Sequence, residues 1–344
     1  MSNRLVTVAD DRYGRKQGQY GITQDRIAEL FKDRSDFSHR PYTWELITKS
    51  RFYMENQILL DNADASRNGR AYKPFVILAE LLDIHDGEFM VYNDCSPEIW
   101  ENVTPEMLDS FAPDVAFDLC EKANGILGMF IKWDSKPIPD GEIGRATHRY
   151  YTTNRCMNKM GLSFYEDAFI CASGMLVLKK TPRVMAIIEE WLKWCCVDEC
   201  SAMGWANIPG DYSFWEEESN PEFDFPGSKL GHRGDQSILG LLLARFNWNF
   251  VQPPQNEMHP ANFLQYCRKD HSYEFTPCLL PLKIGDRVKN VQGSEMTVHQ
   301  IYNGQYGVGP IPGRSGNLEE SGNPMDQMNT HRIIQTVNNW SGEL

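Results

Sequence analysis

The sequence has no apolar run long enough to cross a membrane, and it lacks the paired cysteines of a disulfide or zinc framework. A transmembrane helix needs about 18 or more consecutive apolar residues, and the polar start "MSNRLVTVADDRYGRK" has no apolar signal-peptide core. The nine cysteines are odd in number and show no CxxC spacing, so reduced thiols are expected. These absences predict a soluble, cytoplasmic protein with no membrane span.

Positive charge is also scarce. The chain has 34 Lys and Arg against 47 Asp and Glu, a net charge of -13, which disfavours a broad nucleic-acid surface. The only dense basic cluster is Arg12, Arg15 and Lys16, directly after the apolar run Leu5 to Ala9. This cluster could contact the phosphates of a small ligand, or it could be a solvated loop. Cysteines cluster once, at Cys195, Cys196 and Cys200, where either a metal or core thiols at a helix end would fit.

Short apolar runs alternate with helical patterns through most of the chain, which predicts an α/β fold. The length of 344 residues allows one large core, or one large and one small core. Strands are expected at 4–10, 89–92, 125–133, 171–178 and 248–254, and helices at 73–84, 181–196 and 237–246.

Two of these helices have distinct sequence signals. In 181–196, Thr181 is the expected N-cap and Pro182 the first helical residue, and a buried stripe is expected at Val184, Ile187, Ile188, Trp191 and Leu192. In 73–84, one wide buried face is expected at Phe75, Ile77, Leu78, Leu81 and Leu82.

The composition changes twice toward the C-terminus. Residues 200–230 form an acidic, loop-like stretch, and a loop of this length is usually functional or mobile. After about Pro281, short alternating runs separated by Gly-Asp, Gln-Gly and Asn-Gly turns predict a small β-rich module of the SH3-like kind, followed by a tail. We therefore expect two domains, 1–280 and 281–344.

The strand "FMVY" ends at Asn93 and Asp94, a carboxylate at the edge where open α/β sheets bind ligands. Asp-Cys-Ser-Pro is also good turn chemistry, so Asp94 could simply close the strand.

Three blocks of sequence, in order, resemble a group of GT-A-fold glycosyltransferases from capsule and surface-polysaccharide clusters and from some viruses. They are "GRAYKPFVILAELL…DGEFMVYNDCSPEI", "TTNRCMNKMGLSFYEDAFICASGMLVLKKTPRVMAIIEEWLKWC" and "NPEF…HRGDQSILGLLL", and they cover roughly residues 4 to 265. The resemblance implies a Rossmann-like nucleotide-diphospho-sugar transferase domain, acting in a bacterium or in a virus-infected cell. It implies transfer of a sugar from a nucleotide-sugar donor, most simply to a saccharide.

The resemblance also implies a metal site. In these enzymes the strand ends in a DxD-like motif whose first carboxylate, here Asp94, binds Mn²⁺ or Mg²⁺ at the donor diphosphate. Ser96 stands where a second carboxylate is usual, which is compatible with a hard cation that completes its ligands with phosphate and water. His259 is the expected third ligand, with His232 and His271 as alternatives, although a lone histidine is often structural.

Further donor and catalytic residues follow from the same resemblance. Asp235 would bond the donor sugar and Gln236 would lie near the anomeric carbon, as in retaining enzymes; Asp235 could equally be a helix N-cap. Small residues 172–174 would line the sugars, or they could only allow tight packing. The expected donor-binding residues are Asp10, Arg12, Lys73, Asn93, Arg155, Ala172, Ser173 and Gly174.

Inverting chemistry would require a carboxylate base, for which Glu166, Asp167 and Asp235 are the candidates. Two other functions stay open from the sequence. One is a carbohydrate-binding protein without turnover, and the other is a viral enzyme that glycosylates modified DNA bases with the aid of the C-terminal module.

Overall fold

The computed structural model describes most of the chain up to Cys278 and three strands beyond it. The chain divides into two compact units, residues 1–244 with 248–278, and residues 245–247 with 279–344. The described residues are 3–9, 18–50, 53–54, 71–130, 147–166, 168–201, 232–252, 261–278, 287–289, 295–302 and 305–309.

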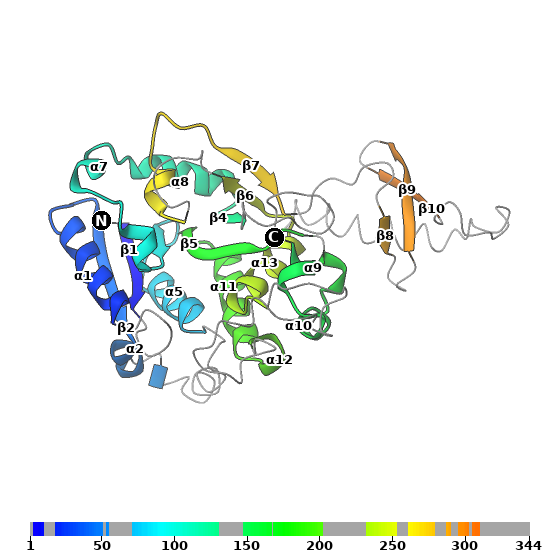
Figure 1. Cartoon of the computed structure of the whole chain (residues 1–344), viewed down its shortest axis with the longest axis horizontal. Coiled ribbons are helices and arrows are strands. Elements are labelled where there is room, and N and C mark those ends of the chain that lie inside the picture. Colours follow the sequence, from blue (N-terminus) through cyan, green and yellow to red (C-terminus); the bar gives the residue numbers. More distant parts are fainter. Residues whose placement is uncertain are drawn as a thin grey trace. The chain divides into compact units, whose positions relative to one another are not determined.

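The first unit is built around a mixed five-stranded sheet with the order β2-β1-β3-β5-β4 (Figure 1). Strand β1 is parallel to β2 and to β3, whereas β5 runs antiparallel to β3 and to β4. This sheet with its helices confirms the expected α/β class. The strands are β1 (Asn3–Ala9), β2 (Phe37–Thr43), β3 (Phe89–Asn93), β4 (Ile126–Phe130) and β5 (Cys171–Lys179).

Strand β2 is the one strand of this sheet that the apolar pattern did not predict. Only Phe37 is buried along "FSHRPYT", and Pro41 lies within the strand. Both features suit an edge strand, where one side needs no ladder hydrogen bonds. A second, two-stranded antiparallel sheet pairs β6 (Asn249–Gln252) with β7 (Glu274–Pro277).

Helices pack on the strands and on one another. Helix α1 packs on β1 and β2, α8 packs on β4 and β5, and α5 packs on β3 and against α11. The longer helices are α1 (Gln19–Phe31), α5 (Tyr72–Asp83), α8 (Pro113–Lys122), α11 (Pro182–Cys195) and α13 (Asp235–Arg245). Shorter ones are α2 (Trp44–Lys49), α6 (Pro97–Trp100), α7 (Pro105–Asp109), α9 (His148–Tyr151), α10 (Asn154–Met160) and α12 (Asp198–Ser201), with 3₁₀ turns at Ser163–Tyr165 and Phe263–Tyr266.

Helix α11 confirms its sequence signals. The Thr181 side chain accepts a hydrogen bond from the Val184 amide, and Pro182 is the first helical residue. Its buried stripe contains Val184, Ile187, Ile188, Trp191 and Cys195, whereas Leu192, expected in the stripe, is only half-buried.

Helix α5 corrects one expectation. Leu82, expected on the buried face, is 52% exposed. Two charged residues, Lys73 and Glu80, are buried on this helix instead. They lie seven residues apart, which places them on the same helix face.

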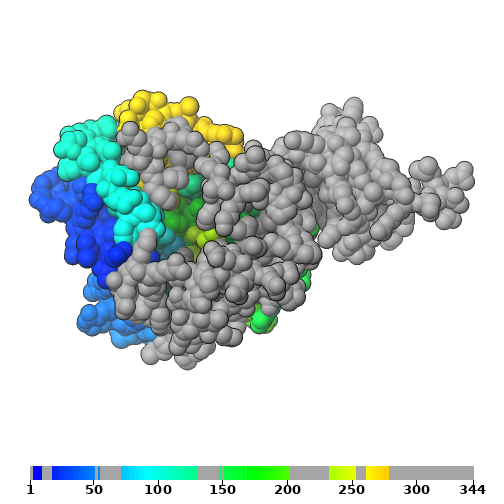
Figure 2. Space-filling view, viewed as in Figure 1, coloured from blue at the N-terminus to red at the C-terminus, as the bar shows by residue number. Residues whose placement is uncertain are grey.

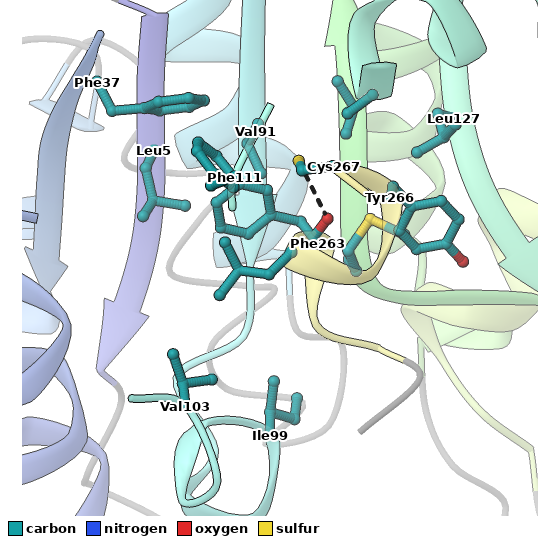
Figure 3. Packing of buried hydrophobic residues seen from close by; sticks show 14 of the residues in the cluster. Leu5, Phe37, Val91, Ile99, Val103, Phe111, Leu127, Phe263, Tyr266 and Cys267 are labelled. Atoms are coloured by element: carbon teal, nitrogen blue, oxygen red, sulfur yellow. Dashed lines mark hydrogen bonds between the residues drawn. The ribbon is translucent and has the colours of Figure 1, made fainter. Parts of the chain in front are cut away.

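Aromatic side chains fill the core on the α1 side of the sheet (Figure 3). Phe263 lies between Phe31, Phe37 and Phe111, with ring centroids 5.5–6.1 Å away. Edge-to-face and tilted pairs of this kind contribute about 0.5–1.5 kcal/mol each beyond the burial of their area. These aromatic contacts fix the segment 261–267 on the α1 side of the sheet, next to the end of β3.

In the second unit, β8 (Arg287–Lys289), β9 (Glu295–Tyr302) and β10 (Gln305–Gly309) form an antiparallel sheet with the order β10-β9-β8. The register shifts between Gly307 and Val308. A β-rich module is thus present, and its SH3-like identity stays a prediction.

Candidate functional site

The candidate site lies at the carboxyl ends of β1 and β3. The chain runs from β1 outward to β2 and then returns to the other side of β1 to form β3. A reversal of this kind in an open α/β sheet leaves a crevice between the two strand ends, and ligands bind there. The Cys95 thiol donates to the Val8 carbonyl oxygen at 2.9 Å and ties the two ends together.

Four polar side chains from distant parts of the chain converge at this edge. Lys73 from the first turn of α5 lies with its Nζ 3.2 Å from both oxygens of Asp94, which follows β3. The same Nζ is 3.3 Å from Ser173 Oγ on β5 and 3.3 Å from Asp235 Oδ2 at the start of α13. Ser173 donates to Asp235 Oδ2 at 2.5 Å. We call Lys73, Asp94, Ser173 and Asp235 the charged cluster.

Burial makes the charged cluster a strongly coupled unit. Lys73 and Asp235 have no exposed side-chain surface, and Asp94 is 25% exposed. Desolvating a single charge costs several kcal/mol, so a buried ammonium is stable here only because two carboxylates and a hydroxyl face its three N–H groups. Asp94 is consequently the one carboxylate of the cluster with exposed side-chain surface.

Asp94 is held from several sides. Tyr92 donates to its Oδ1 at 2.8 Å, and burial together with the Asp94 charge raises the pKa of Tyr92 well above its ordinary value, so the phenol remains a donor. The Trp100 indole donates to the backbone oxygen of Asp94 at 2.8 Å, and the Asp94 amide donates to the Gly174 oxygen at 2.7 Å. The carboxylate orientation is therefore fixed before any ligand arrives.

Gly174 has a steric reason to be glycine. A Cβ at this position would lie 3.0 Å from Asp94 Oδ2, closer than real Cβ atoms ordinarily come. Ala172, two residues earlier on β5, is half-buried. Gly174 thus serves close packing of β5 on the charged cluster, and direct contact of residues 172–174 with a sugar stays a prediction.

Asp235 and Gln236 each carry a buried oxygen that has no hydrogen-bond partner among the described residues, Oδ1 and Oε1 respectively. Asp235 is the first residue of α13, and its other oxygen bonds Lys73 and Ser173, so the N-cap alternative is wrong. A buried acceptor without a donor is costly. Two such acceptors on consecutive residues favour a site that hydroxyl or amide donors of a ligand, or water, complete.

Two buried histidines lie beside the segment that carries Asp235: His232 precedes α13, and the His148 ring lies against Gly240 of that helix. His232 Nε2 lies 2.6 Å from the Cys200 oxygen, and its Nδ1 accepts from the Thr153 amide at 3.4 Å. Burial lowers the pKa of His232 to about 4 and that of His148 to about 3. Both ring nitrogens of His232 are engaged, so this alternative metal ligand has a structural role instead.

The remaining predicted residues are placed as follows. Asn93 is fully buried; it donates to the Gly174 and Ala261 oxygens and accepts from the Phe263 amide, which joins β3 to β5 and to the segment 261–263. Arg155 is exposed on α10.

The remaining described candidates for metal binding do not join the charged cluster. His271, the other alternative ligand, lies in the turn before β7, and the described residues around Cys195, Cys196 and Cys200 hold no metal-binding group. Asp10, Arg12, Asp167, His259 and most of the loop 200–230 lie outside the described residues.

A divalent metal fits this site if phosphate and water supply most of its ligands. Asp94 offers a partly exposed carboxylate, and Ser96, which precedes α6, makes no capping hydrogen bond through its hydroxyl. These are hard oxygen donors, which suit Mg²⁺ or Mn²⁺ when phosphate and water supply the other ligands. Within the described ranges no three His, Cys, Asp or Glu residues come together to hold a metal by themselves.

Sequence reasoning missed Tyr92, Trp100 and Trp191 as parts of this site. Tyr92 lies in β3 and precedes Asp94 by two residues, a spacing that in extended chain places both side chains on one face. Trp191 donates to the Asp235 backbone oxygen at 2.9 Å from α11, where the sequence only indicated a core position. Figure 2 shows green and lime atoms, the colours of β5 and α13, in a hollow beside the cyan residues.

Comparison of the chain with protein-family models, with curated proteins and with solved structures found no match. None of the helices in the described part of the chain has the length and apolar character needed to span a bilayer.

Proposed function

We propose that the first unit is a GT-A-type glycosyltransferase that moves a sugar from a nucleotide-sugar donor to a saccharide or related acceptor. The observation that carries this proposal is the charged cluster at the reversal point between β1 and β3. It presents one partly exposed carboxylate, Asp94, and the start of α13 adds two buried acceptors on Asp235 and Gln236 that have no partner among the described residues. A diphosphate-bearing sugar offers a matching set, namely anionic oxygens with a cation on one side and hydroxyl donors on the other.

The roles of the residues follow from their chemistry. Mn²⁺ or Mg²⁺ held by Asp94 and Ser96 would supply positive charge to the leaving diphosphate. Asp235 Oδ1 and Gln236 Oε1 would accept hydrogen bonds from donor-sugar hydroxyls, and Gln236 would stabilise charge that develops at the anomeric carbon. Lys73 would keep Asp94 and Asp235 in place.

Retention of the anomeric configuration is the expected outcome. Inversion requires a carboxylate that can take a proton from the acceptor. Of the three candidate bases, Asp235 is the one in the charged cluster, and it is a poor base because it is fully buried and one of its oxygens is committed to Lys73 and Ser173. The departing phosphate would then take the proton on the same face. Proton NMR of the product's anomeric centre tests this, and an inverted product would contradict it.

A thermal-shift screen tests the function itself. UDP, GDP, CDP and ADP and their sugar conjugates would be added with Mn²⁺. A ligand present at about a hundred times its Kd adds about 2.7 kcal/mol of stability, or roughly 5–10 °C for a unit of this size. Hydrolysis of the best nucleotide-sugar then separates an enzyme from a protein that only binds carbohydrate.

Asp94→Ala and Asp86→Ala form a matched pair for this screen. Asp86 lies at the opposite end of β3, where its side chain is 84% exposed and pairs with Lys180 at 3.5 Å. We expect Asp94→Ala to lose the Mn²⁺-dependent shift and Asp86→Ala to keep it. The absence of any shift in the wild type across the whole panel would refute the proposed function.

A further inference from the structure

The position of Lys73 has a consequence for how a metal ion can enter the site. Its Nζ lies between two carboxylates and a hydroxyl, 3.2 Å from the Asp94 oxygens and 3.3 Å from both Asp235 Oδ2 and Ser173 Oγ. The Tyr92 ring covers it, with its centroid 5.5 Å away. Without the ammonium, these oxygens would be a donor set of the kind that hard divalent cations bind.

The charges show why only one cation can occupy this place. Asp94 and Asp235 carry two negative charges and Lys73 one positive charge, which leaves the three groups with a net charge of -1. A second cation between the carboxylates would have to approach their oxygens to about 2.0–2.6 Å. It would then lie against the ammonium in a desolvated environment, where like charges repel strongly.

Only the outer edge of Asp94 remains for a metal ion. This edge offers one carboxylate that already accepts bonds from Lys73 and Tyr92, and Ser96 follows two residues later in the chain. Divalent ions that bind through one or two carboxylates commonly take their other ligands from substrate phosphates and water.

We propose that the Lys73 ammonium fills the cation position between Asp94 and Asp235 and excludes free metal ions from it, so that a divalent cation binds here only together with a nucleotide diphosphate. The nucleotide half of this inference rests on the proposed function, whereas the exclusion by Lys73 does not. Lys73 is thus a positioning residue rather than a direct donor ligand.

Mn²⁺ binding, measured by EPR of the free ion in about 0.15 M salt to screen weak surface sites, tests the exclusion without any nucleotide. Asp94→Asn serves as the blank for Mn²⁺ bound elsewhere on this acidic chain. We expect the wild type to bind no more Mn²⁺ than this blank. Lys73→Ala opens the space between the two carboxylates, and we expect it to gain one site, with affinity about tenfold or more above the wild type because a second carboxylate becomes a ligand.

Lys73→Met is the matched variant, because its side chain fills the same space without the charge. We expect it to bind Mn²⁺ more tightly than the wild type, because the repelling charge is gone, but less tightly than Lys73→Ala, because its side chain still fills part of the space. Mn²⁺ binding no tighter than that of the wild type in either variant would overturn the proposal. If the Lys73 variants do not fold, Mn²⁺ binding by the wild type alone still tests the exclusion. One Mn²⁺ above the blank without nucleotide refutes the exclusion.

A second arm adds UDP, GDP, CDP or ADP to the wild type. We expect one Mn²⁺ above the blank with the nucleotide that this site accepts. Nucleotide binding without additional Mn²⁺ would contradict the proposal that the metal ion and the nucleotide diphosphate bind together. If no nucleotide binds, the proposed function fails, and the nucleotide-free measurements still test the exclusion by Lys73.

Discussion

Acid should destabilise the first unit through two buried histidines, His148 and His232. Burial lowers their pKa from 6.5 to about 3 and about 4. Between pH 6.5 and pH 4 the unfolded chain binds protons that the folded chain does not, so stability rises with pH in this window and falls as the solution is acidified. Each histidine contributes a slope of at most about 1.4 kcal/mol per pH unit.

The expected loss can be worked out from these values. For a pKa that moves from 6.5 to 4 or below, acidification from pH 7 to pH 5 removes about 1.9 kcal/mol per histidine, or about 4 kcal/mol for the pair. This is a large fraction of the roughly 5–15 kcal/mol that stabilises most domains. His39, whose pKa burial lowers to about 4, acts in the same direction.

Urea unfolding followed by tryptophan fluorescence measures this loss, because Trp191 and Trp248 are buried in the same unit. With a slope of about 2 kcal/mol per M, the pair should lower the urea midpoint by about 2 M between pH 7 and pH 5, and His39 should lower it by about 1 M more. His232→Gln should flatten the pH dependence by about a third, because three histidines contribute, and substitution of the exposed His85 by Gln is the control. Equal stability at pH 7 and pH 5 would refute the reasoning, since it would mean that the folded chain accepts these protons.

Four further changes test the site and the division of the chain. Asp94→Ala should abolish transfer by nucleotide-sugar assay and leave the circular dichroism spectrum intact; normal activity would remove Asp94 from the proposed site. Gly174→Ala should displace the Asp94 carboxylate, costing about 1–3 kcal/mol in urea unfolding and weakening nucleotide binding; unchanged binding would show that the carboxylate tolerates displacement. Gln236→Ala should lower kcat strongly with little change in donor Kd, because an amide at the anomeric carbon acts mainly in the transition state; an equal loss of donor affinity would place it in ground-state binding. Truncation after residue 280 should leave a folded first unit, because its compact part ends at Cys278; an insoluble product would show that the second unit completes its core.

The sequence by itself determined the elements whose signals are local. Helix α11 begins at Pro182 after the Thr181 cap, and strands β1, β3, β4 and β5 follow short apolar runs, because caps and periodic burial act within a few residues. The sequence also indicated Lys73, Asp94, Ser173 and Asp235 separately, and the fold brings these four together.

Only the tertiary structure decided what each of these residues does. Lys73 meets Ser173 across 100 positions, and Ser173 meets Asp235 across 62. No periodicity within one segment can specify contacts over such separations, since they depend on the strand order β2-β1-β3-β5-β4. The same holds for the burial of Lys73, for Asn93, which joins three segments by hydrogen bonds, and for edge strand β2. Lys73, expected from the resemblance to bind the donor, thus lies with its ammonium enclosed between two carboxylates, where it holds the site together.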